Sequence, residues 1–93
     1  AVAGDPKAHW AMDGLARAQL ARRVGAAEAL DLAKAAYGIA KSPRYLETAA
    51  LAYAVMGDRE SARIAATAAV RMDPANATYR ATLERITQMD EPE

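Results

Sequence analysis

The sequence predicts an all-α domain of about five helices that pack as antiparallel neighbours. Alanine, the strongest helix former, supplies 26 of the 93 residues, and phenylalanine is absent. Apolar residues recur three and four positions apart, which is the spacing of one helix face, and no apolar/polar alternation persists as a strand would require. Short turns with Gly, Pro, Ser or Asp separate these stretches. Helices joined by such short connections lie antiparallel to one another.

The first two helices are expected over residues 6–24 and 26–40. Asp5 can cap the first helix, and Pro6 suits its first position. We expect Gly25 to end this helix, because glycine adopts the left-handed conformation without a Cβ clash. The second helix has a regular apolar stripe, which consists of Ala29, Leu32, Ala33, Ala36, Tyr37 and Ala40.

The third and fourth helices are expected over residues 43–56 and 59–72. Ser42 is the cap of the third helix and Pro43 its first residue. Gly57 and Asp58 form the next turn and cap. The stripes of these two helices are Leu46, Ala49, Ala50 and Tyr53, then Ala62, Ala65, Ala66, Ala69 and Val70.

The last helix is expected to start at a second proline cap and to act as the end of the domain. Asp73 and Pro74 repeat the cap device of the third helix, and the new helix runs to about Met89. Its outer face is polar enough to meet water, and the tail over 90–93 is charged. The whole chain, 1–93, is therefore expected to form one domain.

The chain repeats itself, and the repeated unit is a pair of helices. The apolar positions of the first helix recur in the third helix, where Met12, Leu15 and Ala16 correspond to Leu46, Ala49 and Ala50. Those of the second helix recur in the fourth, where Ala29, Ala33 and Ala36 correspond to Ala62, Ala66 and Ala69. The second offset is shorter by one position, so the first pair has one extra residue at its turn. A period of about 34 residues with two helices per unit is typical of stacked helical arrays.

The middle unit, 43–76, resembles the tetratricopeptide repeat (TPR). It has the family's small, aromatic and turn residues in order, namely Ala50, Tyr53, Gly57, Ala62, Ala69 and Pro74. Leu46 stands where the family often has tryptophan, and Ala66 stands where it often has a large aromatic residue. The unit over 8–41 is more degenerate, and residues 77–89 supply only a capping helix.

This resemblance implies a right-handed stack of antiparallel helix pairs, an α-solenoid, with a concave groove lined by the first helix of each pair. Such a groove receives a peptide or a helix of a partner protein, so the implied function is a protein-interaction scaffold or adaptor. The implied groove residues are Trp10, Asp13, Arg17, Leu20, Arg44, Glu47, Leu51, Val55, Ala81 and Arg85. Leu51 and Val55 stand out because they lie off the packing stripe of their helix. The TPR subclass that grips acidic chaperone tails is not expected, because only Arg17 is basic at the matching positions.

A second hypothesis is a structural or self-association domain, which includes the case of a fragment from a larger protein. Short arrays expose much apolar surface at their ends, and that surface can pack on a second copy. Trp10 either anchors a partner or covers the N-terminal edge of the stack. A helical domain that regulates an attached enzyme is a third hypothesis.

Composition argues against several classes of function. Twelve basic and twelve acidic residues give no net charge, whereas domains that bind nucleic acid or membranes carry a basic excess. We therefore expect no nucleic-acid partner, and we expect no membrane insertion because no segment approaches about 18 consecutive strongly apolar residues. With no cysteine and one histidine, His9, the chain offers no metal set, and it has no glycine-rich phosphate loop. We expect neither an enzyme nor a cofactor, and the composition fits a cytoplasmic or an exported protein.

Overall fold

The structure, a computed structural model, describes residues 9–90, with side chains through residue 88. This part of the chain contains five helices and no strand, which confirms the predicted all-α class. The helices are α1 (His9–Ala21), α2 (Ala26–Ile39), α3 (Pro43–Met56), α4 (Arg59–Met72) and α5 (Ala77–Asp90). None of these described helices has the length and apolar character needed to cross a membrane.

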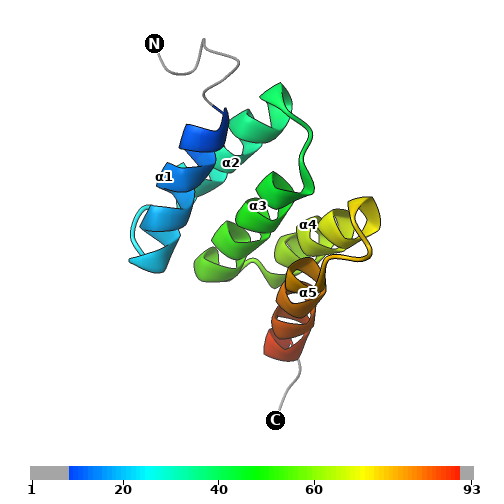
Figure 1. The fold of residues 1–93 in the computed structure, drawn as a ribbon. Coiled ribbons are helices and arrows are strands. Elements are labelled where there is room, and N and C mark those ends of the chain that lie inside the picture. The colour runs from blue at the N-terminus through cyan, green and yellow to red at the C-terminus, as the bar shows by residue number, and fades with distance from the viewer. Residues whose placement is uncertain (1–8, 91–93) are drawn as a thin grey trace.

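The helices lie in two layers (Figure 1). Each helix packs against the next in the chain, and α1 also contacts α3 while α3 also contacts α5. In the view of Figure 1, α2 and α4 lie behind the layer formed by α1, α3 and α5. Side chains from three helices far apart in the sequence therefore meet on one side of the molecule.

The core between the layers is built largely from the alanines of the predicted stripes, but Leu15, an apolar position of the first helix, is 50% exposed, and the buried Ala52 lies outside the stripes. A methyl side chain lets helix axes approach toward the short end of the usual packing range of about 8–10 Å. Nine alanines are at most 1% exposed: Ala16, Ala29, Ala33, Ala36, Ala50, Ala52, Ala62, Ala66 and Ala69. Larger side chains fill the remaining core space, chiefly Met12, Leu20, Leu30, Tyr45 and Ile86.

The predicted boundaries of α3 are confirmed by its caps. The Ser42 hydroxyl accepts a hydrogen bond from the Arg44 N–H at 3.3 Å, and Pro43 occupies the first turn. At the other end Gly57 has a φ of 86°, the left-handed conformation in which glycine avoids a clash. The Asp58 side chain then accepts from the Ser61 N–H at 3.2 Å and starts α4.

The predicted end of α1 is wrong, because the helix stops at Ala21 rather than at residue 24. The residue that reverses the chain is Arg23, with a φ of 55°. The Arg23 N–H bonds to the Leu20 carbonyl at 3.0 Å, and the next N–H bonds to the Gln19 carbonyl at 3.1 Å. This is the same pair of closing bonds that ends α3 at Gly57.

Gly25 is left-handed, as predicted, but it begins α2 instead of ending α1. Its φ is 63°, and its carbonyl accepts the Ala29 N–H at 2.8 Å as the first bond of α2. The predicted start of the first helix at Asp5 and Pro6 lies outside the described residues.

The cap of α5 differs from the predicted Asp73–Pro74 cap, although the helix starts where the capping helix over 77–89 was expected. The helix begins at Ala77, and the side chain of Asn76 caps it by accepting from the N–H groups of Thr78 at 2.9 Å and Tyr79 at 3.2 Å. The Asp73 carbonyl accepts the Asn76 N–H at 3.1 Å, which closes a turn that contains Pro74. Proline suits the second position of such a turn as well as it suits a helix start, so the sequence signal was ambiguous.

Candidate functional site

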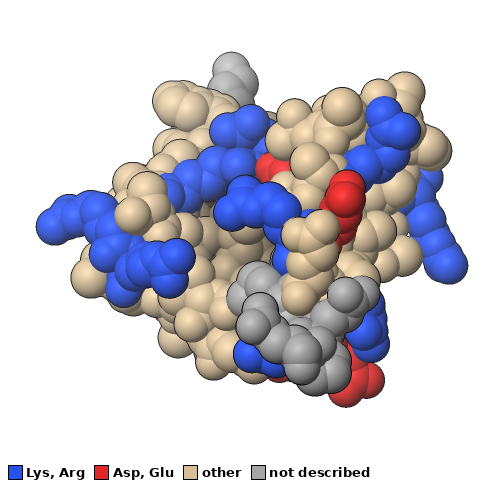
Figure 2. Space-filling model, turned by 90° about the horizontal axis from the view of Figure 1, so that it is seen from below, with Lys and Arg blue, Asp and Glu red and all other residues tan. Residues whose placement is uncertain are grey.

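A pocket of about 360 Å³ opens where α1, α3 and α5 meet. It is lined by Arg17, Leu20, Ala21, Arg23, Leu51, Ala54, Val55, Thr82, Arg85 and Ile86, and we call it the groove. Five of the ten predicted groove residues are among them: Arg17, Leu20, Leu51, Val55 and Arg85. Figure 2 looks onto the molecule from below, where Lys and Arg side chains border a hollow and few acidic side chains are seen.

The floor of the groove consists of apolar side chains that are mostly buried and packed against the core. Leu20 and Ile86 are buried, and Leu51 is half-buried and packs against the core alanines between α1, α2 and α3. Val55 lies nearest to solvent among these apolar side chains, with 38% of its surface exposed. An apolar ligand group would therefore meet preformed surface rather than mobile side chains.

The other predicted groove residues lie outside the lining. Trp10 is 68% exposed on α1, and Ala81 is exposed on α5. Asp13 and Glu47 are only 1% and 3% exposed, so these two carboxylates face the interior. Arg44 is bound to Asp13 and contributes to the same internal network.

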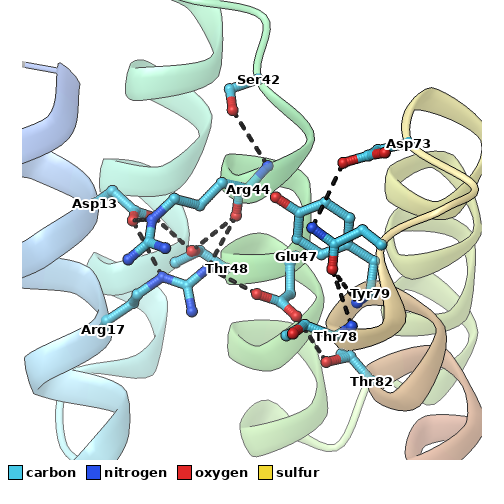
Figure 3. A network of polar contacts seen from close by, with 11 residues as sticks. Asp13, Arg17, Ser42, Arg44, Glu47, Thr48, Asp73, Thr78, Tyr79 and Thr82 are labelled. Atoms are coloured by element: carbon cyan, nitrogen blue, oxygen red, sulfur yellow. Dashed lines mark hydrogen bonds and ion pairs between the residues drawn. The ribbon is translucent and has the colours of Figure 1, made fainter.

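Asp13 is the first of two buried carboxylates that join the odd-numbered helices (Figure 3). Its Oδ2 accepts from Arg17 Nε at 3.1 Å and from Arg44 Nε at 2.7 Å. Its Oδ1 accepts from the hydroxyl of Thr48, which is fully buried on α3. The carboxylate thereby links α1 to α3 with both oxygens satisfied, as a buried charge requires.

Glu47 repeats this arrangement between α3 and α5. Its Oε2 accepts from the Thr82 hydroxyl at 2.7 Å, and its Oε1 accepts from Arg17 Nη2 at 2.8 Å. In both contacts the threonine lies 35 residues after the carboxylate. We call the two pairs, Asp13 with Thr48 and Glu47 with Thr82, the carboxylate–threonine ladder.

Arg17 sits between the two carboxylates and at the edge of the groove. It also donates to the Arg44 carbonyl at 3.1 Å. Burial alone would lower the pKa of Arg17, but the hydrogen bond from its guanidinium to Glu47 and the charges of Asp13 and Glu47 outweigh it and raise the pKa. Arg17 therefore stays protonated, and its charge is paired with carboxylates of the same chain.

The groove has two further arginines, and both are exposed. Arg23 follows α1 and Arg85 lies on α5, and each lines the groove. The ion pairs found among the described residues involve neither of them. Their charges are therefore available to a ligand in the groove.

Residues typical of catalytic or metal sites are sparse and do not converge here. His9 Nδ1 contacts the Tyr45 hydroxyl, and the two rings meet edge to face at 5.6 Å between centroids. This contact joins α1 to α3. Within the described part of the chain, no group of three or more His, Cys, Asp or Glu side chains is placed to hold a metal ion.

Sequence reasoning missed several groove residues, notably Arg23, Thr82 and Ile86. The internal repeat contains a signal for two of them. Thr82 occupies the place that Thr48 has in the preceding unit, and Arg23 occupies the place that the turn glycine Gly57 has in the following unit. Ile86 gives no such signal, because its position in the stripe of α5 is equally typical of core packing.

Comparisons with known proteins add no assignment to the groove. No family model, no curated protein and no solved structure matched the chain.

Proposed function

We propose that this protein is an interaction scaffold that holds a segment of a partner protein in the groove between α1, α3 and α5. The observation that supports this is the groove itself, an apolar floor with a cationic rim built from three helices. A binding site for a peptide needs apolar pockets for its anchor side chains and a few polar groups that fix its direction. The proposal includes no catalytic step and no cofactor.

The proposal takes the helices as a TPR-like stack. In support, the helix starts follow the repeat of the sequence: α2 begins at Ala26 and α4 at Arg59, while α3 begins at Pro43 and α5 at Ala77. The connections that follow α1 and α3 begin at Arg23 and Gly57 and close with the same pattern of backbone hydrogen bonds. In a stack of this kind the first helix of each pair lies on one side, so their exposed side chains form one continuous surface.

The test is peptide selection from a displayed library of random dodecapeptides on the immobilised protein. Val55→Glu places a charge on the groove floor and is expected to weaken the selected peptides about tenfold or more. Met56→Glu is the matched control, because Met56 is exposed, adjacent on the same helix end and absent from the groove lining. Equal binding to wild type and to Val55→Glu would refute the proposal.

A second candidate function is self-association through the outer face of α1. The exposed residues of this helix are all apolar or small, and those outside the groove lining are Trp10, Gly14, Leu15 and Ala18. A Cβ added at Gly14 would meet nothing within 4 Å, so packing inside the chain does not account for a glycine there. A mid-helix glycine costs about 1 kcal/mol relative to alanine, and close approach of a second helix would account for it.

The occupant proposed for this face is a second copy of the chain. The face has no charge, so two copies can meet around a twofold axis without like-charge contact. Light scattering over a range of concentrations would measure the mass, and Leu15→Glu is expected to shift it to that of the monomer. Ile64→Glu, which changes an aliphatic residue on α4 that is 63% exposed against 50% for Leu15, is the control. A wild-type mass that stays monomeric at every concentration contradicts this candidate.

A further inference from the structure

The charged residues that line the groove are all positive. Its lining contains three arginines and no acidic side chain, although the whole chain is neutral. Asp13 and Glu47, the two carboxylates bound to the lining residue Arg17, are buried and also held by Arg44 and the two ladder threonines. The positive charge left to a ligand is that of Arg23 and Arg85.

Arg23 occupies a backbone position that favours glycine. Its φ of 55° lies in the left-handed region, where a side chain clashes and glycine does not. The corresponding turn of the second helix pair uses Gly57 at a φ of 86°. The chain thus has an arginine in the strained place, at a residue that lines the groove.

Nothing in the described fold makes an arginine necessary at this turn. The Arg23 side chain is exposed and forms no ion pair with residues 9–88. The closing hydrogen bonds use only the backbone, which glycine would supply equally well. Backbone strain of this kind is found at ligand-binding sites, where the side chain has a use that offsets it.

We infer that the groove recognises an acidic amphipathic segment of a partner protein. Its carboxylates pair with Arg23 and Arg85, and its apolar side chains lie on Leu51, Val55 and Ile86. This inference rests on the proposed function and names the chemistry of the partner. Arginine suits the task because its guanidinium binds a carboxylate through two parallel hydrogen bonds.

The apolar floor favours a protein segment over a nucleic acid. A single-stranded nucleic acid is held by a run of phosphate contacts together with aromatic side chains on which bases stack. The groove lining contains no aromatic residue, and its two exposed arginines, one after α1 and one on α5, share the lining with the aliphatic Leu51 and Val55 of α3. A peptide that carries both carboxylates and aliphatic side chains would match this combination of arginines and aliphatic residues.

The test uses three single-charge variants and the dodecapeptides selected as above. Arg23→Gly and Arg85→Gln each remove one exposed groove charge, and Arg22→Gln is the matched control. Arg22 is exposed, adjacent to Arg23 and outside the groove lining, so it changes the net charge equally. Dissociation constants are measured for each variant at low and at high salt, and melting temperatures are recorded.

We expect the selected peptides to be rich in Asp, Glu and aliphatic residues. Arg23→Gly and Arg85→Gln should each weaken binding about tenfold, and Arg22→Gln should change it less than about twofold. High salt should weaken the wild type more than either groove variant. Arg23→Gly should at the same time raise the melting temperature by roughly 4–8 °C, since glycine relieves the strain. If Arg23 had only a structural role, Arg23→Gly would not raise the melting temperature and weaken peptide binding at the same time.

The outcomes separate this inference from the proposed function. Selection of uncharged or basic peptides would overturn the inference of an acidic partner. So would Arg23→Gly and Arg85→Gln variants that bind the selected peptides as tightly as the Arg22→Gln variant does. In either case the scaffold function stands, provided that Val55→Glu still weakens binding about tenfold or more. Tight binding of labelled oligothymidine that Arg23→Gly weakens would overturn the inference in favour of a nucleic acid. Peptides indifferent to Val55→Glu would refute the scaffold function itself.

Discussion

Replacement of Thr82 by valine tests whether the carboxylate–threonine ladder stabilises the fold. Valine has nearly the shape of threonine, so the change removes the hydroxyl and leaves the packing. Glu47 then keeps Arg17 on Oε1 at 2.8 Å but loses the 2.7 Å bond that Oε2 accepts from Thr82. Because Glu47 is 3% exposed, water does not readily replace that donor.

The expected loss of unfolding free energy is about 1.5–3 kcal/mol, which is the usual worth of a hydrogen bond to a charged group. In a domain of this size each kcal/mol lowers the melting temperature by about 4–8 °C. Circular dichroism during heating and urea titration measures both quantities. Thr87→Val is the matched control on the same helix: the Thr87 hydroxyl donates at 2.9 Å to the Leu83 carbonyl, one turn back. That carbonyl already accepts within the helix, so the control should cost less than about 0.5 kcal/mol.

A double-mutant cycle measures the interaction energy between Glu47 and Thr82 separately from their other contacts. Glu47→Gln combined with Thr82→Val should give a coupling energy of about 0.5–3 kcal/mol, as for other residues in direct contact. Two results would refute the reasoning. One is a Thr82→Val variant as stable as Thr87→Val. The other is strict additivity of the two changes at Glu47 and Thr82.

Three further predictions concern packing, capping and pH. Ala50→Leu should cost about 1–3 kcal/mol in urea unfolding, because Ala50 is fully buried at the contact of α3 with α4 and has no room for extra methylenes. Asn76→Ala should cost about 1 kcal/mol and Asp73→Ala distinctly less, as measured by melting, because Asn76 alone caps α5. Burial, reinforced by a nearby carboxylate, raises the pKa of Tyr45 and Tyr79 above the usual 10.0. The unfolded chain therefore ionises first, so stability is complete below about pH 10 and falls as the pH rises above it, less steeply in Tyr45→Phe.

The helices could be predicted from the sequence because each signal is local. Alanine at three- and four-residue spacing specifies which side of a helix is buried, and the observed α3 and α4 have the predicted bounds. The caps at Ser42 and Asp58 depend on residues within one turn of each other. Such signals need no knowledge of what the helix packs against.

The chemistry of the groove could be predicted only in part, because it depends on long-range contacts. A carboxylate at Asp13 or Glu47 looks like a surface residue, since acidic side chains are rarely buried without a partner. Apart from Arg17, which lies one turn along from Asp13, their donors lie 30 to 35 residues away in the chain. The turn at Arg23 was missed because a glycine two residues later satisfies the usual preference. Both errors arise where tertiary contacts or function override the local rule.

An alanine core leaves the position of its helices loosely specified, and the ladder removes that freedom. Methyl groups interdigitate little, so one alanine stripe can slide along another at small cost, whereas a buried carboxylate is satisfied only in register with its donors. Thr48 tests this consequence for the groove, because it is fully buried and does not line the groove itself. Thr48→Val should weaken peptide binding by roughly 0.5–2 kcal/mol at temperatures where the variant is fully folded, since α1 and α3 lose the Thr48–Asp13 bond, which orients the carboxylate that Arg17 binds at the edge of the groove. Unchanged affinity in that variant would mean that the alanine packing alone positions the groove, and that the ladder contributes stability without shaping the site.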